Sequence, residues 1–141
     1  MADPKGFLKY NRATPSTRKA EDRVKDYKEI YQPVDETFIK DHSSRCMDCG
    51  VPFCHSGCPL GNLIPDFNDA VYHEEWQKAY EILSETNNFP EFTGRICPAP
   101  CEASCVLGIN KPAVAIEYIE KSIIEKAFAD GYATPRIPSV R

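Results

Sequence analysis

Apolar side chains recur at helical spacing in several stretches of this sequence, separated by polar or proline-containing segments. The first stretch covers residues 17–31, where one predicted face carries Val24, Tyr27, Ile30 and Tyr31. Pro33 follows it, so the pattern predicts an amphipathic helix that ends before the proline. Asp35 is then suited to cap a short helix that carries Phe38 and Ile39 toward the first cysteine.

The second half of the chain contains two longer helical patterns. One runs over residues 64–85, where Pro65 fits a first helical turn and a break near His73 divides the pattern into two helices. Its apolar positions are Phe67, Val71, Trp76, Ala79, Tyr80 and Leu83. The other pattern runs over residues 112–130 and ends at Gly131, a residue type that commonly follows the last helical residue.

The cysteines lie between these helices, in segments that are predicted to be loops. Residues 45–61 are rich in glycine and proline, and residues 87–100 form a second loop before a short helical turn at residues 100–105. We find no internal repeat and no convincing strand. The expected fold is therefore all-α, with two cysteine-rich loops between helices.

The chain divides into three predicted regions. Residues 1–16 form a polar arm, residues 17–131 form the helical domain, and residues 132–141 form a proline-containing linker. The arm is expected to lie on another surface through its larger side chains, Phe7, Leu8 and Tyr10.

Composition and charge exclude several classes of function. The chain has 141 residues, 42% of them hydrophobic, and a net charge of −4. This charge argues against a nucleic-acid surface and against a polybasic membrane patch. The sequence contains no run of about eighteen apolar residues, so it predicts no membrane span. Its N-terminus lacks the apolar core of a signal peptide. We therefore expect a cytosolic protein that binds neither nucleic acid nor membrane.

Seven cysteines in two groups are the main chemical signal. The first group reads Cys46-x2-Cys49-x4-Cys54-x3-Cys58-Pro59, and the second reads Cys97-x3-Cys101-x3-Cys105. Cytosolic thiols are normally reduced, so metal ligation explains so many cysteines better than disulfides do. Closely spaced cysteines that end in Cys-Pro are typical of iron–sulfur proteins, which points to electron transfer.

Two four-iron clusters need one more ligand than the cysteines supply, because each cluster takes about four. Glu120 falls in the middle of the apolar arc predicted for the last helix, and a carboxylate facing a core is costly unless it is paired or bound to metal. Glu120 is therefore the candidate for the missing ligand. The alternatives are that it pairs with an arginine such as Arg95 or extends to solvent at the helix edge.

Spacing alone leaves the grouping of the cysteines open. By the Cys-Pro rule, Cys58 joins the second cluster, so that Cys46, Cys49 and Cys54 share the first cluster with one late cysteine. The second cluster then holds Cys58, Glu120 and the two remaining cysteines. Zinc is the structural alternative, but the x3 spacings and the Cys-Pro pair favour iron.

Several long motifs resemble one known family. GFLKYNR, RCMDCGVPFCHSGCPLGNLIPDFNDAVY and NNFPEFTGRICPAPCEASCVLGINKPAVAIEYIEKSI occur in order over nearly the whole chain. They closely resemble the N-terminal iron–sulfur domain in the small (beta) subunit of NADPH-dependent glutamate synthase, which is related to the N-terminal domain of dihydropyrimidine dehydrogenase. The resemblance implies an alpha-helical ferredoxin-like fold with two four-iron, four-sulfur clusters.

The same resemblance implies the ligand sets. One cluster would be held by Cys46, Cys49, Cys54 and Cys105, and the other by Cys58, Cys97, Cys101 and Glu120. The chain would relay electrons from a flavoprotein portion that binds FAD and NADPH to the glutamate synthase large subunit. In that enzyme the electrons serve glutamate synthesis from glutamine and 2-oxoglutarate.

The chemistry of that enzyme is expected to lie largely outside these residues. The family's flavoprotein continues beyond RIPSVR into a Gly-rich dinucleotide motif, and no G-x-G-x-x-G motif occurs in this sequence. We therefore expect residues 132–141 to lead toward a flavoprotein domain or subunit, and the domain to have no catalytic residues of its own. The alternatives are a metal-stabilised docking module without a redox role, and the same domain in another NADPH-dependent oxidoreductase.

Overall fold

The computed structural model describes residues 2–135 and residue 139, and within them the fold is helical with no strand, which confirms the all-α prediction. Among these residues no helix has the length and apolar character needed to cross a membrane. The helices are α1 Gly6–Lys9, α2 Ala20–Arg23, α3 Glu36–Ser43, α4 Phe53–Gly57, α5 Ile64–Tyr72, α6 Trp76–Ser84, α7 Pro90–Ile96, α8 Pro100–Ala103 and α9 Ile116–Asp130, with a 3-10 turn at Val106–Ile109.

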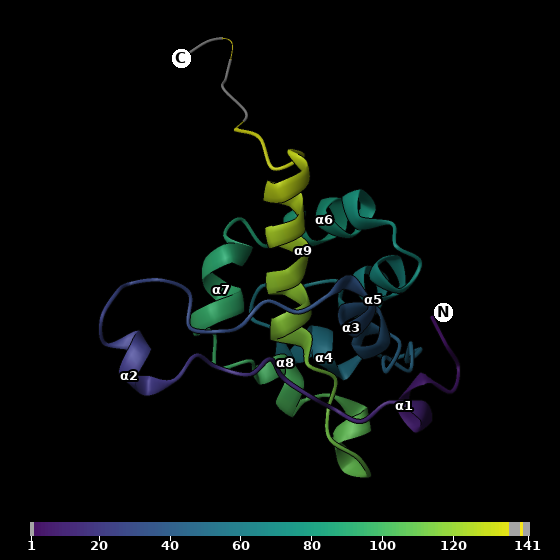
Figure 1. Cartoon of the computed structure of the whole chain (residues 1–141). Helices are drawn as coiled ribbons and strands as arrows, with labels where there is room; N and C mark the ends of the chain where they lie inside the picture. The colour runs from purple at the N-terminus through teal and green to yellow at the C-terminus, as the bar shows by residue number, and fades with distance from the viewer. Residues whose placement is uncertain (1, 136–138, 140–141) are drawn as a thin grey trace.

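Helix α9 is the central element of the fold. Figure 1 shows it running through the middle of the molecule, with α7 on one side, α3, α5 and α6 on the other, and α4 and α8 near its N-terminal end. Its buried side chains join those of α5 and α6 in one core, whose fully buried members include Phe67, Val71, Leu83, Ile119 and Ile123. Burial of this apolar surface is the main favourable term that holds the helices together.

Helices α7 and α9 approach closely at Gly94. A Cβ atom at this position would lie 2.7 Å from Lys121 Cβ and 2.8 Å from Lys121 Cα, so a side chain cannot be accommodated without moving the helices apart. The glycine inside α7 therefore serves packing rather than breaking the helix.

Local signals placed several helix ends correctly. Asp35 caps α3, since its Oδ1 accepts the Phe38 N–H at 2.7 Å. The break at His73 separates α5 from α6, and the next residue, Glu74, has a left-handed φ of 62°. At the end of α9, Gly131 has a φ of 82°, as expected of a residue that terminates a helix.

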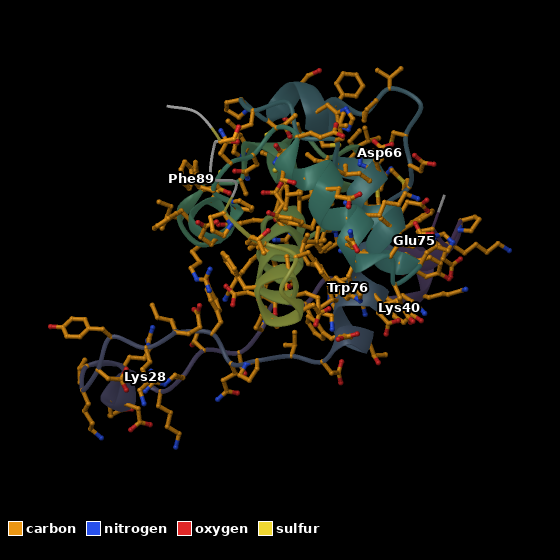
Figure 2. The ribbon with its side chains drawn as sticks, turned by 90° about the horizontal axis from the view of Figure 1, so that it is seen from above. Lys28, Lys40, Asp66, Glu75, Trp76 and Phe89 are labelled. Carbon is orange, nitrogen blue, oxygen red and sulfur yellow. The ribbon has the colours of Figure 1, made fainter. Side chains whose placement is uncertain are left out.

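The prediction of a helix over residues 17–31 is wrong. Only α2 is helical there, and the flanking chain forms a narrow antiparallel pair, in which Arg18 N–H donates to Ile30 O at 2.8 Å beside a bridge between Thr17 and Tyr31. Figures 1 and 2 show this segment, which carries Lys28, projecting from the body of the molecule. The proposed apolar face therefore has no core to pack against, and Val24 and Tyr27 are almost fully exposed.

Both cysteine segments contain more helix than predicted. The expected loop over residues 87–100 contains α7, which starts at Pro90, and the expected loop over residues 45–61 contains α4. Asn87 organises the turn before α7, because its Oδ1 accepts the Phe89 N–H at 3.1 Å and its Nδ2 donates to Thr93 Oγ1 at 2.8 Å. The short turn predicted at residues 100–105 is confirmed as α8.

The N-terminal arm lies on this chain's own helical domain. Phe7 packs against the core, whereas Leu8 remains 58% exposed. Further along, Arg12 donates to the carbonyl oxygens of Ala113 and Val114, both at 3.1 Å. At the other end of the chain, the Tyr132 N–H donates to Ala127 O at 3.0 Å, while residues 136–138, 140 and 141 of the predicted linker lie outside the described residues.

His42 attaches the arm to α3 in a way that depends on its charge. The Ala13 N–H donates to His42 Nε2 at 3.0 Å, and Nδ1 lies 2.7 Å from Phe38 O, to which it donates. The bond from Ala13 requires the neutral ring, because Nε2 can accept only when it carries no proton, whereas the Nδ1 donation persists when the ring is charged. Burial, and the positive charges of Arg45 and Arg12, lower the pKa of His42 despite the hydrogen bond to Phe38 O.

We expect the arm to loosen as the pH falls below about 6.5, the ordinary pKa of histidine. The pKa of His42 is lower in the folded chain than in the unfolded chain, so at low pH the unfolded chain binds more protons. The contribution of His42 to stability is therefore fully present above about pH 6.5 and is lost as the pH falls through the folded-state pKa. Thermal unfolding of the protein and its His42→Gln variant should be compared from pH 7.5 to 5.5, with hydrogen exchange over residues 11–16. The same pH dependence in both proteins would contradict this role.

Candidate metal centre

Two short helices, α4 and α8, organise the cysteines. Helix α4 contains Cys54 and is followed directly by Cys58, while α8 contains Cys101 and is followed closely by Cys105. The helices pack against each other at Gly57, where a Cβ would lie only 2.2 Å from Ser104 Oγ. This contact brings the two cysteine groups, distant in sequence, into one region of the molecule.

The first set of thiols surrounds a small cavity. Its lining includes Cys46, Cys49, Cys54 and Cys105 together with apolar side chains such as Phe53, Ile64, Leu107 and Val114. Within the described residues, no three His, Cys, Asp or Glu side chains converge closely enough to hold a single metal ion. The four thiols therefore face a shared space rather than a single point.

Burial strongly affects these thiols. Burial, with a smaller contribution from the neighbouring cysteines, raises the pKa of Cys46 to about 12 and that of Cys54 to about 11. Cys49 is shifted in the same direction, mainly by burial and by Cys105. Thiolate is the form that ligates metal. A group of positive charge in the cavity would stabilise this form, so the donor set suits an iron–sulfur cluster.

A second set of groups lies around Cys101. This residue is buried, and burial raises the pKa of its thiol. The charges of Glu120, Cys58 and Glu102 act in the same direction, so each of these groups lies near Cys101. Cys97 lies two residues before Ala99, whose N–H donates to Cys97 Sγ at 3.4 Å. Of the predicted second set, Cys58 and Glu120 thus lie near Cys101, whereas the Cys97 thiol, within the part of the chain that the structure describes, accepts this one local hydrogen bond.

Glu120 is buried, with 6% of its surface exposed, although it carries a carboxylate. Burial raises its pKa to about 7, against the effect of a hydrogen bond from Asn62 Nδ2 to Oε1 at 2.9 Å. The alternative partner Arg95 instead binds Glu29 and Glu125, at 2.7 and 2.6 Å. Neither the pairing with Arg95 nor the extension of Glu120 to solvent is therefore observed.

Each cysteine segment contains a residue in the left-handed region that is not glycine. Asp48, between Cys46 and Cys49, has a φ of 50°, and Ala99, between Cys97 and Cys101, has the same value. Aspartate adopts this conformation more readily than alanine, for which it costs roughly 1–2 kcal/mol. Strained backbone conformations of this kind cluster at functional sites, where the surrounding structure holds them in place.

Two residues that support the site, Arg45 and Asn62, were not identified from the sequence, and His55 supports it from within the first cysteine segment. Arg45, which precedes Cys46, is 1% exposed and donates to the carbonyl oxygens of Tyr10, Pro112 and Ala113. Asn62 binds Glu120, and His55 Nε2 accepts the Ile64 N–H at the start of α5, at 3.0 Å. A buried arginine beside a cysteine carries no local sequence signal, because its partners lie far away in the chain.

Comparison with known proteins agrees with this donor chemistry. The chain matches the family described as dihydropyrimidine dehydrogenase domain II, 4Fe-4S cluster, over residues 23–132. It is 55% identical over 139 residues to the glutamate synthase [NADPH] small chain of Mycobacterium tuberculosis, a match that covers 98% of this chain and 28% of the relative.

Two further relatives show the same relationship. The corresponding small chain of Bacillus subtilis is 51% identical over 150 positions, covering 100% of this chain and 30% of the relative. The glutamate synthase [NADH] of Saccharomyces cerevisiae is 48% identical over 139 residues, which cover 97% of this chain and 6% of the relative. The chain therefore spans less than a third of the length of these relatives. It belongs to the iron–sulfur family of dihydropyrimidine dehydrogenase domain II, in the form that glutamate synthase small chains carry.

Proposed function

We propose that this chain holds two four-iron, four-sulfur clusters and relays electrons between them. Cys46, Cys49, Cys54 and Cys105 would ligate the first cluster. Cys58, Cys97, Cys101 and Glu120 would ligate the second. When bound, the clusters supply one-electron redox chemistry, and the protein tunes it through ligand type, hydrogen bonds and burial.

The observation that carries the proposal is the cavity lined by four cysteines from two distant segments. Four cysteines gathered around one apolar space supply the donor set that a four-iron cluster takes. The proximity of Glu120 and Cys58 to Cys101 gives separate support for the second set. The packing of α4 against α8 brings together Cys54 and Cys101, which lie in these helices, and Cys58 and Cys105, which follow them.

The protein's own residues would hold the clusters and limit their contact with water. Ile64, Leu107 and Val114 line the first cavity and keep its walls apolar, which favours the transfer of electrons without proton exchange with solvent. Arg45 would fix the segment that begins with Cys46, through its three carbonyl contacts.

The relatives suggest where the electrons come from and go. We infer that they pass from NADPH through FAD on a flavoprotein portion to these clusters, and then to the large subunit of a cytoplasmic glutamate synthase. There they would reduce the imine formed from 2-oxoglutarate and glutamine-derived ammonia. The names of the relatives, and the extent of this chain they share, support this placement.

Metal analysis of anaerobically purified protein tests the proposal. We expect about eight iron atoms and about eight acid-labile sulfides per chain, because each cluster contains four of each. Zinc near two per chain without sulfide would overturn electron transfer and leave a structural metal site. Four irons would leave one of the two ligand sets without support.

A further inference from the structure

Asn62 lies at the centre of a hydrogen-bonded chain that ends on the Glu120 carboxylate. Its side chain is buried, with 1% of its surface exposed. Its Nδ2 donates to Glu120 Oε1 at 2.9 Å, and its Oδ1 accepts from Thr86 Oγ1 at 2.8 Å. Residues from the loop before α5, from the turn after α6 and from α9 thus meet here.

The chemistry of the three groups fixes their orientation. An ionised carboxylate can only accept, so the NH₂ side of the Asn62 amide must face Glu120. The amide oxygen then points to Thr86, whose hydroxyl donates to it and resists rotation of the amide. Among the described residues no hydrogen-bond donor is found for Glu120 Oε2, so this oxygen is available to bind iron.

We propose that Asn62, held in place by Thr86, is a positioning residue that orients Glu120 and moderates its charge at the second cluster. This inference rests on the proposed function, since it assumes that Glu120 ligates iron. Hydrogen-bond partners of metal ligands fix the orientation of the ligand and tune its basicity, and their loss typically lowers metal affinity by about 10- to 100-fold.

The direction of the electronic effect follows from charge. A donor to Oε1 withdraws electron density from the carboxylate. Without this donor the carboxylate keeps more negative charge, which stabilises the oxidised cluster, even though the ligand is held less firmly in position. Loss of Asn62 should therefore make the potential of one cluster more negative and leave the potential of the other unchanged.

The chain offers a matched control in Asn68, which is also fully buried. Its Nδ2 donates to Ile64 O at 2.7 Å within α5, and among the described residues no hydrogen bond joins it to Glu120. Asn62→Leu and Asn68→Leu both remove a buried amide, so both are expected to lower thermal stability. Only the first removes the partner of Glu120.

The test is a redox titration of the anaerobic protein followed by EPR, together with iron removal by a chelator. For Asn62→Leu we expect the reduction potential of the second cluster to become more negative. We also expect the chelator concentration that removes half of this cluster to fall by about tenfold or more. Thr86→Val should shift the same potential by less than Asn62→Leu does. Thr86→Ser, which keeps the hydroxyl, should show the wild-type potential. Asn68→Leu should leave both potentials unchanged.

Two outcomes would overturn the inference while the proposed function stands. In both, the wild-type protein holds both clusters. In the first outcome, Asn62→Leu leaves both potentials unchanged. In the second, Asn68→Leu shifts the potential of the second cluster as much as Asn62→Leu does. A wild-type protein without iron and sulfide would overturn both the inference and the proposed function. The wild-type measurement therefore separates the two failures.

Discussion

Replacing Cys105 by alanine is expected to remove one cluster, about four of the expected eight irons, and to leave the other in place. Cys105 lines the cavity with Cys46, Cys49 and Cys54, while Cys101, only one helical turn earlier, lies near Cys58 and Glu120. Cys101→Ala should therefore remove a similar amount of iron from the other site. Iron and sulfide analysis gives the amounts, and EPR identifies which cluster remains.

The pair of variants tests the grouping of ligands and not only their number. Different residual EPR spectra are expected, and together they should account for the wild-type spectrum. Ser104→Ala is the control, since it alters the residue between the two cysteine positions and removes only a hydroxyl that donates to Pro100 O at 3.0 Å. Identical spectra from the two cysteine variants would show that the grouping is wrong.

Replacing Arg45 by methionine is expected to lower the free energy of unfolding by about 3 kcal/mol. The guanidinium donates to Tyr10 O at 3.1 Å, to Ala113 O at 2.9 Å and to Pro112 O at 2.6 Å. Methionine leaves these partly buried acceptors with fewer donors and loosens the arm, which Arg12 still joins to the segment before α9. Thermal unfolding under anaerobic conditions should show a decrease of roughly 10 °C in the midpoint.

A second arginine separates this effect from the simple loss of a charge. Arg18 pairs with Asp26 at 2.7 Å on the projecting segment, where both side chains are partly exposed. Surface pairs contribute about 0–1 kcal/mol, so Arg18→Met should change the midpoint little. Arg45→Lys should fall between the wild type and Arg45→Met, because an ammonium cannot reach all three carbonyls in the guanidinium geometry. Equal midpoints for Arg45→Met and Arg18→Met would rule out the anchoring role.

The helices that could be predicted are those with local signals and a core to pack against. Asp35 marked the start of α3, His73 the break between α5 and α6, and Gly131 the end of α9. Residues 17–31 had the helical spacing but lack a surface to cover, so spacing alone misled. Helix α7 was missed because Gly94 looks like a breaker until its contact with Lys121 is known.

The candidate site divides in the same way. Cysteine spacing indicated iron, and the apolar arc around Glu120 correctly predicted its burial. The grouping of late cysteines required the resemblance to a known family, since spacing left it open. Asn62 could not be found from the sequence, because no local pattern relates position 62 to position 120.

The projecting segment between Ser16 and Gln32 offers a place to cut or extend the chain. Its two ends are joined at the base, where the Gln32 N–H donates to Ser16 O at 2.8 Å and Arg18 pairs with Ile30. Its tip around Lys25 and Lys28 is exposed, and the segment projects away from α4 and α8 (Figure 1). Exposed tips are preferred sites of proteolytic nicking and tolerated insertion. A protease that cleaves after lysine would therefore nick the domain there, and an affinity tag or fluorophore placed at the tip would leave the metal-binding region undisturbed.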